Sequence, residues 1–165
     1  GHEVAIHGNC HIAQGVASIK DGIRDMLDGR RNLENRFNRI IKGMAYPDSG
    51  VNYTQFTDYS EIKAYLQMLG IVYGRSSGHD NNNFRVPTDW HKWIPTCHHN
   101  NSNLYSWLNQ FKELNNKEGY LAHLHPRLFY LWGHTYEFEN DNNWDVIKEF
   151  CKQAADSSDI WFATI

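Results

Sequence analysis

The chain has 165 residues, of which 41% are hydrophobic and 21% are charged, as is usual for a globular protein. Its formal net charge is −3 and its pI is near 6.4, so a large basic surface for nucleic acid is not expected. Three cysteines without Cys-x-x-Cys spacing do not indicate a disulfide framework. No apolar run approaches the roughly 18 residues that cross a membrane.

Strands and helices alternate in the first half of the chain. Short apolar stretches predict strands at residues 4–6, 40–46 and 71–73. Apolar residues at helical spacing predict helices over residues 16–37 and 59–69.

Punctuating residues set the expected bounds of these two helices. Gly29 is a candidate break within the first helix. Thr57 or Asp58 is expected to cap the second helix, and Gly70 is expected to end it.

The second half continues the alternation. Helical spacing predicts helices over residues 103–114 and 144–155. Apolar stretches predict further strands at residues 84–87, 120–123, 128–132 and 160–163. Two stretches are predicted to be loops, at residues 74–83 and at residues 88–101. The loop at residues 88–101 is expected at the rim of a site.

This alternation is typical of an α/β protein with a largely parallel sheet or barrel. No repeat or linker divides the chain, so we predict one domain over residues 1–165. The pattern starts and stops on strands, which predicts an incomplete barrel. An open sheet edge would favour a homo-oligomer.

Two histidines follow the first predicted strand. His7 and His11 lie four residues apart, where α/β proteins build sites at strand ends. Neutral imidazoles suit zinc and similar metals, so we predict that both rings bind one divalent metal; two ordinary histidines are the alternative. Asp48 is a candidate third ligand, although a turn-forming role explains it more simply.

A third histidine, His134, follows the apolar stretch at residues 128–132. A histidine beside a metal-bound water is suited to protonate a leaving group near neutral pH, which makes it our catalytic candidate. A structural histidine is the alternative. We interpret Cys10 as a small buried residue, and Cys97-His98-His99 as a loop near the site, because adjacent side chains rarely share one centre.

Three segments, in order, resemble motifs of the polysaccharide deacetylases, the NodB-homology domains of carbohydrate esterase family 4. Residues 1–11, Gly-His-Glu-Val-Ala-Ile-His-Gly-Asn-Cys-His, resemble the second motif, a GHE-type strand followed by His-x-x-x-His. Residues 43–47, Gly-Met-Ala-Tyr-Pro, resemble the third motif, a proline-containing turn. Residues 131–134, Leu-Trp-Gly-His, resemble the last motif, Leu-x-x-His.

The resemblance implies a distorted (β/α) barrel and a metal-dependent hydrolase that removes acetyl groups from an acetylated sugar or polysaccharide. One divalent transition metal, zinc foremost, would be bound by His7 and His11, polarise the acetyl carbonyl and activate a water. His134 would be the general acid. The substrate pocket would be lined by Leu131, at the acetyl methyl, and by Trp132, Tyr46, Pro47, Trp90 and Trp93.

The chain departs from the family pattern at three places. The Asp pair of the first motif, which supplies the base and the third metal ligand, has no counterpart here. Ile12 stands where the second motif usually has proline, and Met44 or Lys42 stands near the usual arginine of the third. We therefore expect a chain that lacks the N-terminal motif and is weakly active or inactive by itself.

Two other interpretations stay open. The chain could be a catalytically disabled carbohydrate-binding or scaffolding member of the same fold, with exposed aromatic rings stacking on sugars. A closed structural zinc site would need four ligands, which requires His98 or His99 to fold over. An extracellular or cell-envelope location follows from the resemblance alone.

Overall fold

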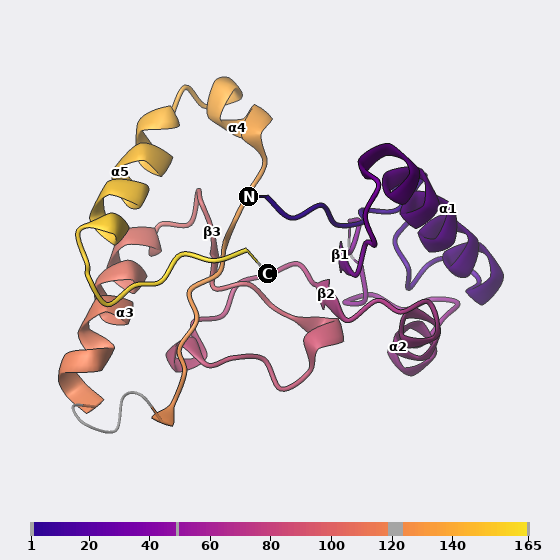
Figure 1. Ribbon diagram of the computed structural model, residues 1–165, viewed down its shortest axis with the longest axis horizontal. Helices are drawn as coiled ribbons and strands as arrows, with labels where there is room; N and C mark the ends of the chain where they lie inside the picture. Colours follow the sequence, from indigo (N-terminus) through magenta and orange to yellow (C-terminus); the bar gives the residue numbers. More distant parts are fainter. Residues whose placement is uncertain (1, 49, 119–123, 165) are drawn as a thin grey trace. The chain divides into compact units, whose positions relative to one another are not determined.

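The computed structural model describes residues 2–48, 50–118 and 124–164 (Figure 1). The chain forms two compact units, which are described separately. Unit 1 comprises Gly1–Ser77, Pro87–Ile94 and Thr164–Ile165, and unit 2 comprises Gly78–Val86 and Pro95–Ala163. The single domain over residues 1–165 stays a prediction.

Short parallel strands are joined in chain order in unit 1. Strand β1 (Gly43–Ala45) pairs in parallel with strand β2 (Tyr73–Arg75). Single parallel bridges extend this pairing on both sides, from Ile6 to Met44 and from Arg75 to Trp93. Parallel neighbours need a crossover connection, which here contains a helix between Ile6 and β1 and between β1 and β2. The strands are shorter than predicted, and only Ile6 of residues 4–6 is paired.

Helix α1 (Ile19–Phe37) begins three residues later than predicted and is not broken at Gly29. Ser18 caps it, because its side-chain oxygen accepts a hydrogen bond from the Asp21 backbone N–H at 3.2 Å. Gly29 instead allows a close approach: a Cβ there would lie 3.1 Å from the carbonyl oxygen of Gly8. The glycine therefore seats the segment after Ile6 on the helix.

Helix α2 (Tyr59–Met68) confirms the predicted local signals. Asp58 is its N-cap, and the Glu61 side chain accepts from the Asp58 backbone N–H at 2.8 Å. Gly70 follows with a φ of +71°, a left-handed conformation that glycine adopts without penalty.

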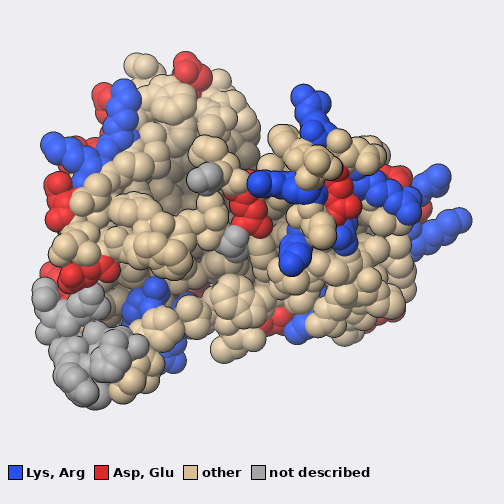
Figure 2. Space-filling model, in the orientation of Figure 1, with Lys and Arg blue, Asp and Glu red and all other residues tan. Residues whose placement is uncertain are grey.

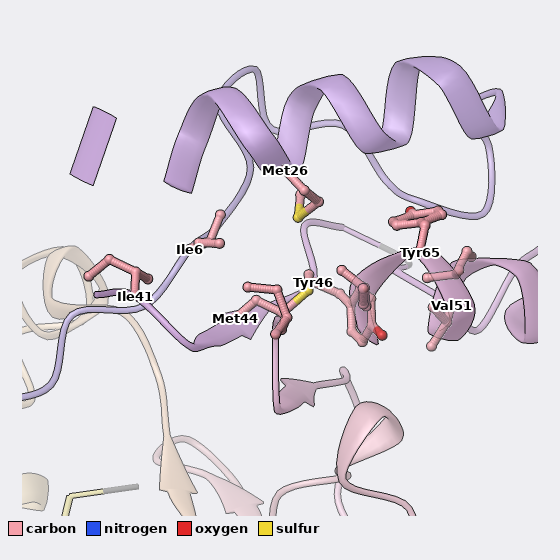
Figure 3. Close-up of a cluster of buried hydrophobic side chains, with 10 residues drawn as sticks. Ile6, Met26, Ile41, Met44, Tyr46, Val51 and Tyr65 are labelled. Atoms are coloured by element: carbon pink, nitrogen blue, oxygen red, sulfur yellow. The ribbon is translucent and has the colours of Figure 1, made fainter. Parts of the chain in front are cut away.

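The core of unit 1 lies between these helices and the strands (Figure 3). Met26 of α1 and Met44 of β1 are both buried, as is Ile6. Burying a side chain of this size contributes about 1.5–3 kcal/mol. The core thus holds Ile6 and β1 in place, and His7 and Asp48 follow them in the chain.

Unit 2 contains a second parallel pair, β3 (Cys97–His98) with β4 (Leu131–Trp132). Helices α3 (Leu104–Glu118) and α5 (Trp144–Ala155) lie side by side in Figure 1, and the buried Leu108 and Phe150 belong to one hydrophobic cluster. Helix α5 has the predicted bounds. A short helix, α4 (Thr135–Asn140), follows β4 and was not predicted.

Several sequence-based predictions are wrong in detail. Residues 88–101 are not only a loop, since they contain the 3₁₀ turn Trp90–Lys92 and strand β3. Residues 84–87 are not a strand, because the 3₁₀ turn Asn82–Phe84 precedes a single antiparallel bridge from Arg85 to Arg127. Residues 160–163 form no strand, because their backbone pairs with no strand of the described part of the chain. The strand predicted at 120–123 lies outside the described residues.

The described residues form a mixed α/β structure with two small parallel sheets, and no barrel is identified among them. None of the described helices is both long and apolar enough to cross a bilayer. Figure 2 shows basic and acidic side chains intermixed on the part of the surface that α1 forms.

Candidate functional site

Two exposed histidines of unit 1 face each other. The Nε2 atoms of His7 and His11 lie 3.1 Å apart, and the two rings meet edge to face with centroids 4.7 Å apart. His7 immediately follows Ile6, at the predicted strand end. The structure therefore brings together the two residues that the sequence predicts as metal ligands.

The other ring nitrogen of each histidine faces an acceptor. Nδ1 of His7 donates to the carbonyl oxygen of Ala45 at 2.9 Å, which places the proton on Nδ1 and a lone pair on Nε2. Nδ1 of His11 lies 3.6 Å from Asp48 Oδ2. Asp48 thus orients the ring from the side away from His7, and this arrangement does not place it as a third ligand.

A buried carboxylate holds the turn between the two histidines. Asp25 of α1 is 4% exposed, and its Oδ1 accepts from the backbone N–H groups of Asn9 at 3.0 Å and Cys10 at 2.6 Å. His11 then adopts a φ of +54°, which non-glycine residues rarely do. Such strain persists only where the surroundings determine it, and it clusters at functional sites.

At 3.1 Å the two Nε2 atoms have either a proton or a cation between them. Either His11 Nε2–H donates a hydrogen bond to His7 Nε2, or both nitrogens bind one cation. Two nitrogen ligands about 2.0–2.1 Å from a tetrahedral zinc lie about 3.3 Å apart. Nδ1–H bonded to a carbonyl or carboxylate is also the usual outer-shell arrangement of metal-bound histidine.

Unit 2 contains a second group, which we call the histidine–glutamate cluster: His98, His99, His134 and Glu137. Oε2 of Glu137 lies 3.1 Å from His98 Nε2, 3.2 Å from His134 Nδ1 and 3.7 Å from His99 Nε2. The same oxygen accepts from the His134 backbone N–H at 2.9 Å, because His134 is the N-cap of α4. The cluster therefore converges on one carboxylate oxygen.

Burial and neighbouring groups set the electrostatics of the cluster. Burial lowers the pKa of His98, and the nearby rings of His99 and His134 lower it further, against the opposing effect of Glu137. Burial raises the pKa of Glu137, but hydrogen bonds from His134 and the nearby His98 outweigh burial and hold it below its usual value. A neutral His98 and an ionised Glu137 are the forms expected near neutral pH.

The predicted pocket residues of unit 1 are more buried than expected. Tyr46 is 2% exposed and its hydroxyl donates to the carbonyl oxygen of His91 at 2.7 Å, so its ring belongs to the core. Pro47 is also buried. Trp93 is 5% exposed, whereas Trp90 is 44% exposed and stands on it edge to face. Of these four, Trp90 presents the open aromatic surface.

The predicted site residues of unit 2 lie together. Leu131 and Trp132 form β4 and are half-buried, and His134 comes two residues after β4. The indole of Trp132 meets the His98 ring edge to face with centroids 4.6 Å apart. His7 and His11 belong to the other unit, so a single site formed with His134 stays a prediction.

Sequence reasoning missed three contributors. Asp25 and Glu137 carried no signal beyond helical spacing, although the Glu three residues after His134 is the spacing of a capping box. His99 was assigned to a loop but is 2% exposed. Cys10 was predicted to be buried and is exposed, because its backbone rather than its side chain is held by Asp25.

Comparison of the chain with models of known protein families, with curated proteins and with solved structures found no match. The resemblance to polysaccharide deacetylases therefore depends on the three sequence motifs alone.

Proposed function

We propose that the chain is a metal-dependent hydrolase of the polysaccharide deacetylase type, which removes acetyl groups from an acetylated sugar or polysaccharide. The observation that carries this proposal is the pair of facing Nε2 atoms of His7 and His11, 3.1 Å apart. His7 Nδ1 donates to the Ala45 carbonyl, and Asp48 faces His11 Nδ1, so a cation bound by both Nε2 atoms would replace the hydrogen bond between them.

A divalent transition metal bound there, most simply Zn²⁺, would supply Lewis acidity toward the acetyl carbonyl. Asp25 holds the turn that sets the spacing of the two rings. Among the described residues no third side-chain ligand joins this pair. The weak activity expected from the sequence agrees with this incomplete ligand set.

His134 is the proposed proton donor to the departing amine or alkoxide. Its Nδ1 faces Glu137 at 3.2 Å, which leaves Nε2 for proton transfer. Leu131 precedes it by three residues, as the pocket for the acetyl methyl requires in the resembled motif.

The first test is metal content together with acetate release. The purified chain should contain about one metal that the His7→Ala/His11→Ala variant loses, and acetate release from N-acetylated and O-acetylated oligosaccharides should fall at least about 100-fold in that variant. His125→Ala, at an exposed histidine, is the control. Unchanged metal content and unchanged acetate release in the double variant would contradict the proposal.

The exposed ring of Trp90 favours a second candidate, carbohydrate binding without catalysis. The Trp93 ring packs edge to face against the Trp90 ring, and exposed aromatic faces stack on sugars. This alternative predicts that glycan binding survives in His7→Ala/His11→Ala and is lost in Trp90→Ala. The deacetylase proposal predicts that acetate release is lost in the former variant.

A further inference from the structure

We propose that unit 2 binds a second divalent transition metal, held by the histidine–glutamate cluster. This site goes beyond the proposed function, since its existence does not depend on His7 and His11. It shares His134 and Glu137 with that function, and a metal held there would occupy His134 Nδ1 and leave His134 Nε2 exposed to a substrate. All four of its side chains lie in unit 2.

The donor atoms of three members of the cluster, His98, His134 and Glu137, lie within 4.8 Å of one another. Ligands about 2.0–2.1 Å from zinc lie about 3.3–3.4 Å from one another in a tetrahedron. Glu137 Oε2 lies 3.1, 3.2 and 3.7 Å from the three ring nitrogens that face it. Two imidazoles and one carboxylate are a three-ligand set that zinc uses with an open fourth position, and His99 is the nearby fourth donor.

A second observation concerns His99. It is 2% exposed, and neither ring nitrogen has a hydrogen-bond partner within the described part of the chain. A buried polar atom left without a partner destabilises the folded state. Its Nδ1 packs against Gly133, where a Cβ would collide with the ring, so Nε2 is the atom directed at Glu137. A cation in the cluster would give this nitrogen a partner.

The surroundings are those of a metal site with an apolar shell. Phe138 covers the His99 ring with centroids 4.2 Å apart, and Trp132 meets the His98 ring edge to face. Such a shell limits access of water and strengthens charge interactions within it. Cys97 is adjacent in sequence, but burial raises the pKa of its thiol to about 12, which disfavours the thiolate that a metal would need.

Metal binding at His98 would break a hydrogen bond that the metal-free protein makes, and this loss can be measured. The Asn100 backbone N–H donates to Nδ1 of His98 at 3.2 Å, so neutral metal-free His98 carries its proton on Nε2. Metal loading requires the neutral ring to exchange its Nε2 proton, through solvent, for a proton on Nδ1. The bond from Asn100 to Nδ1 then breaks, and the amide resonance of Asn100 should shift when the site fills.

The experiment is a titration of the metal-stripped full chain with Zn²⁺ and Co²⁺, with calorimetry and visible spectra as readouts. The wild-type chain should bind two metals, and His7→Ala/His11→Ala should bind one. In that variant Co²⁺ should show the intense visible bands of tetrahedral coordination. His98→Gln/Glu137→Gln should lose this second metal, and the glutamine that replaces Glu137 still permits the capping box of α4. His125→Ala is the control.

The outcomes separate the two proposals. If the wild-type chain binds one metal that only His7→Ala/His11→Ala removes, the second site is overturned and the first stands. If one metal is bound that only His98→Gln/Glu137→Gln removes, the second site stands and the proposed function loses its metal. Binding that neither double variant changes overturns the second site, as does a filled site with no shift of the Asn100 amide.

Discussion

At the scale of single residues, the chemistry of this protein depends on which nitrogen of each imidazole is occupied. His7 donates a hydrogen bond from Nδ1 to the Ala45 carbonyl and directs Nε2 at His11, whereas His98 accepts the Asn100 N–H on Nδ1 and directs a protonated Nε2 at Glu137. In a neutral ring, a backbone carbonyl at Nδ1 makes Nε2 an acceptor, and a backbone N–H at Nδ1 makes Nε2 a donor. The backbone group that faces Nδ1 therefore makes the difference between His7 and His98.

Asp25 is the residue whose replacement should loosen the site of unit 1. Asp25→Ala leaves two backbone N–H groups without their acceptor, and hydrogen bonds to charged groups contribute about 1.5–3 kcal/mol each. We expect a loss of about 3 kcal/mol in the free energy of unfolding, measured by urea denaturation. Asp28→Ala, at a more exposed aspartate of the same helix, is the control. Equal stabilities of the two variants would contradict this role.

At the scale of elements, α1 is connected to the strand that follows it through Glu34. Its Oε1 accepts from the Ile41 backbone N–H at 3.0 Å and from Arg30 at 2.7 Å. These two contacts hold the pKa of Glu34 below its usual 4.5, the backbone hydrogen bond being the larger cause. The end of α1 and the entry to β1 are therefore joined by a carboxylate that must be ionised.

This contact predicts how stability depends on pH. A carboxyl whose pKa is lowered by folding stabilises the protein above its unfolded pKa, and that stability is lost as the pH falls through the folded pKa. At pH 7, Glu34→Gln should be less stable than the wild-type chain by about 1–2 kcal/mol. The difference should shrink below about pH 4.5. Urea denaturation at pH 7 and pH 3.5 measures it, with Asp28→Asn as the control. A pH-independent difference would exclude an ionic role.

At the scale of the whole molecule, neither unit is a continuous stretch of chain. Unit 1 also includes Pro87–Ile94, which follows the unit 2 segment Gly78–Val86 in the chain. The backbone N–H of Trp93 in this segment donates to the Gly74 carbonyl at 2.9 Å, and the Trp93 carbonyl accepts from the Ser76 backbone N–H at 2.8 Å. The ring of His91 also contacts the Ile71 carbonyl at 2.9 Å. The segment thus contributes backbone hydrogen bonds to β2 and buried side chains to unit 1.

A truncation experiment follows from this interleaving. A chain ending at Ser77 lacks the buried Trp93, and removal of a buried tryptophan side chain alone costs about 3–5 kcal/mol. We expect it to show no cooperative thermal unfolding by circular dichroism. A chain ending at Ile94 keeps these contacts and should unfold more cooperatively. Cooperative unfolding of the shorter chain at the same temperature would show that the returning segment is dispensable.

The sequence by itself determined those elements whose signals are local. Helix α2 begins at its Asp58 cap and is followed by Gly70, and α5 has the predicted bounds, because capping and helical periodicity act within a few residues. The facing of His7 and His11 was also predictable, because both follow one strand end at a spacing of four. Whether that pair acts in a deacetylase, with His134, stays a prediction.

Tertiary structure decided the rest, because burial and pairing join residues distant in sequence. Cys97-His98 became a strand only by pairing with β4, and the apolar residues at 160–163 did not become one. Asp25 of α1 accepts from the Cys10 backbone N–H, 15 residues away in the chain, and α4 presents Glu137 to the His98 ring of β3. No periodicity encodes such contacts. The histidine–glutamate cluster, which adjacent histidines in a sequence do not suggest, exists because the fold gathers it around one oxygen.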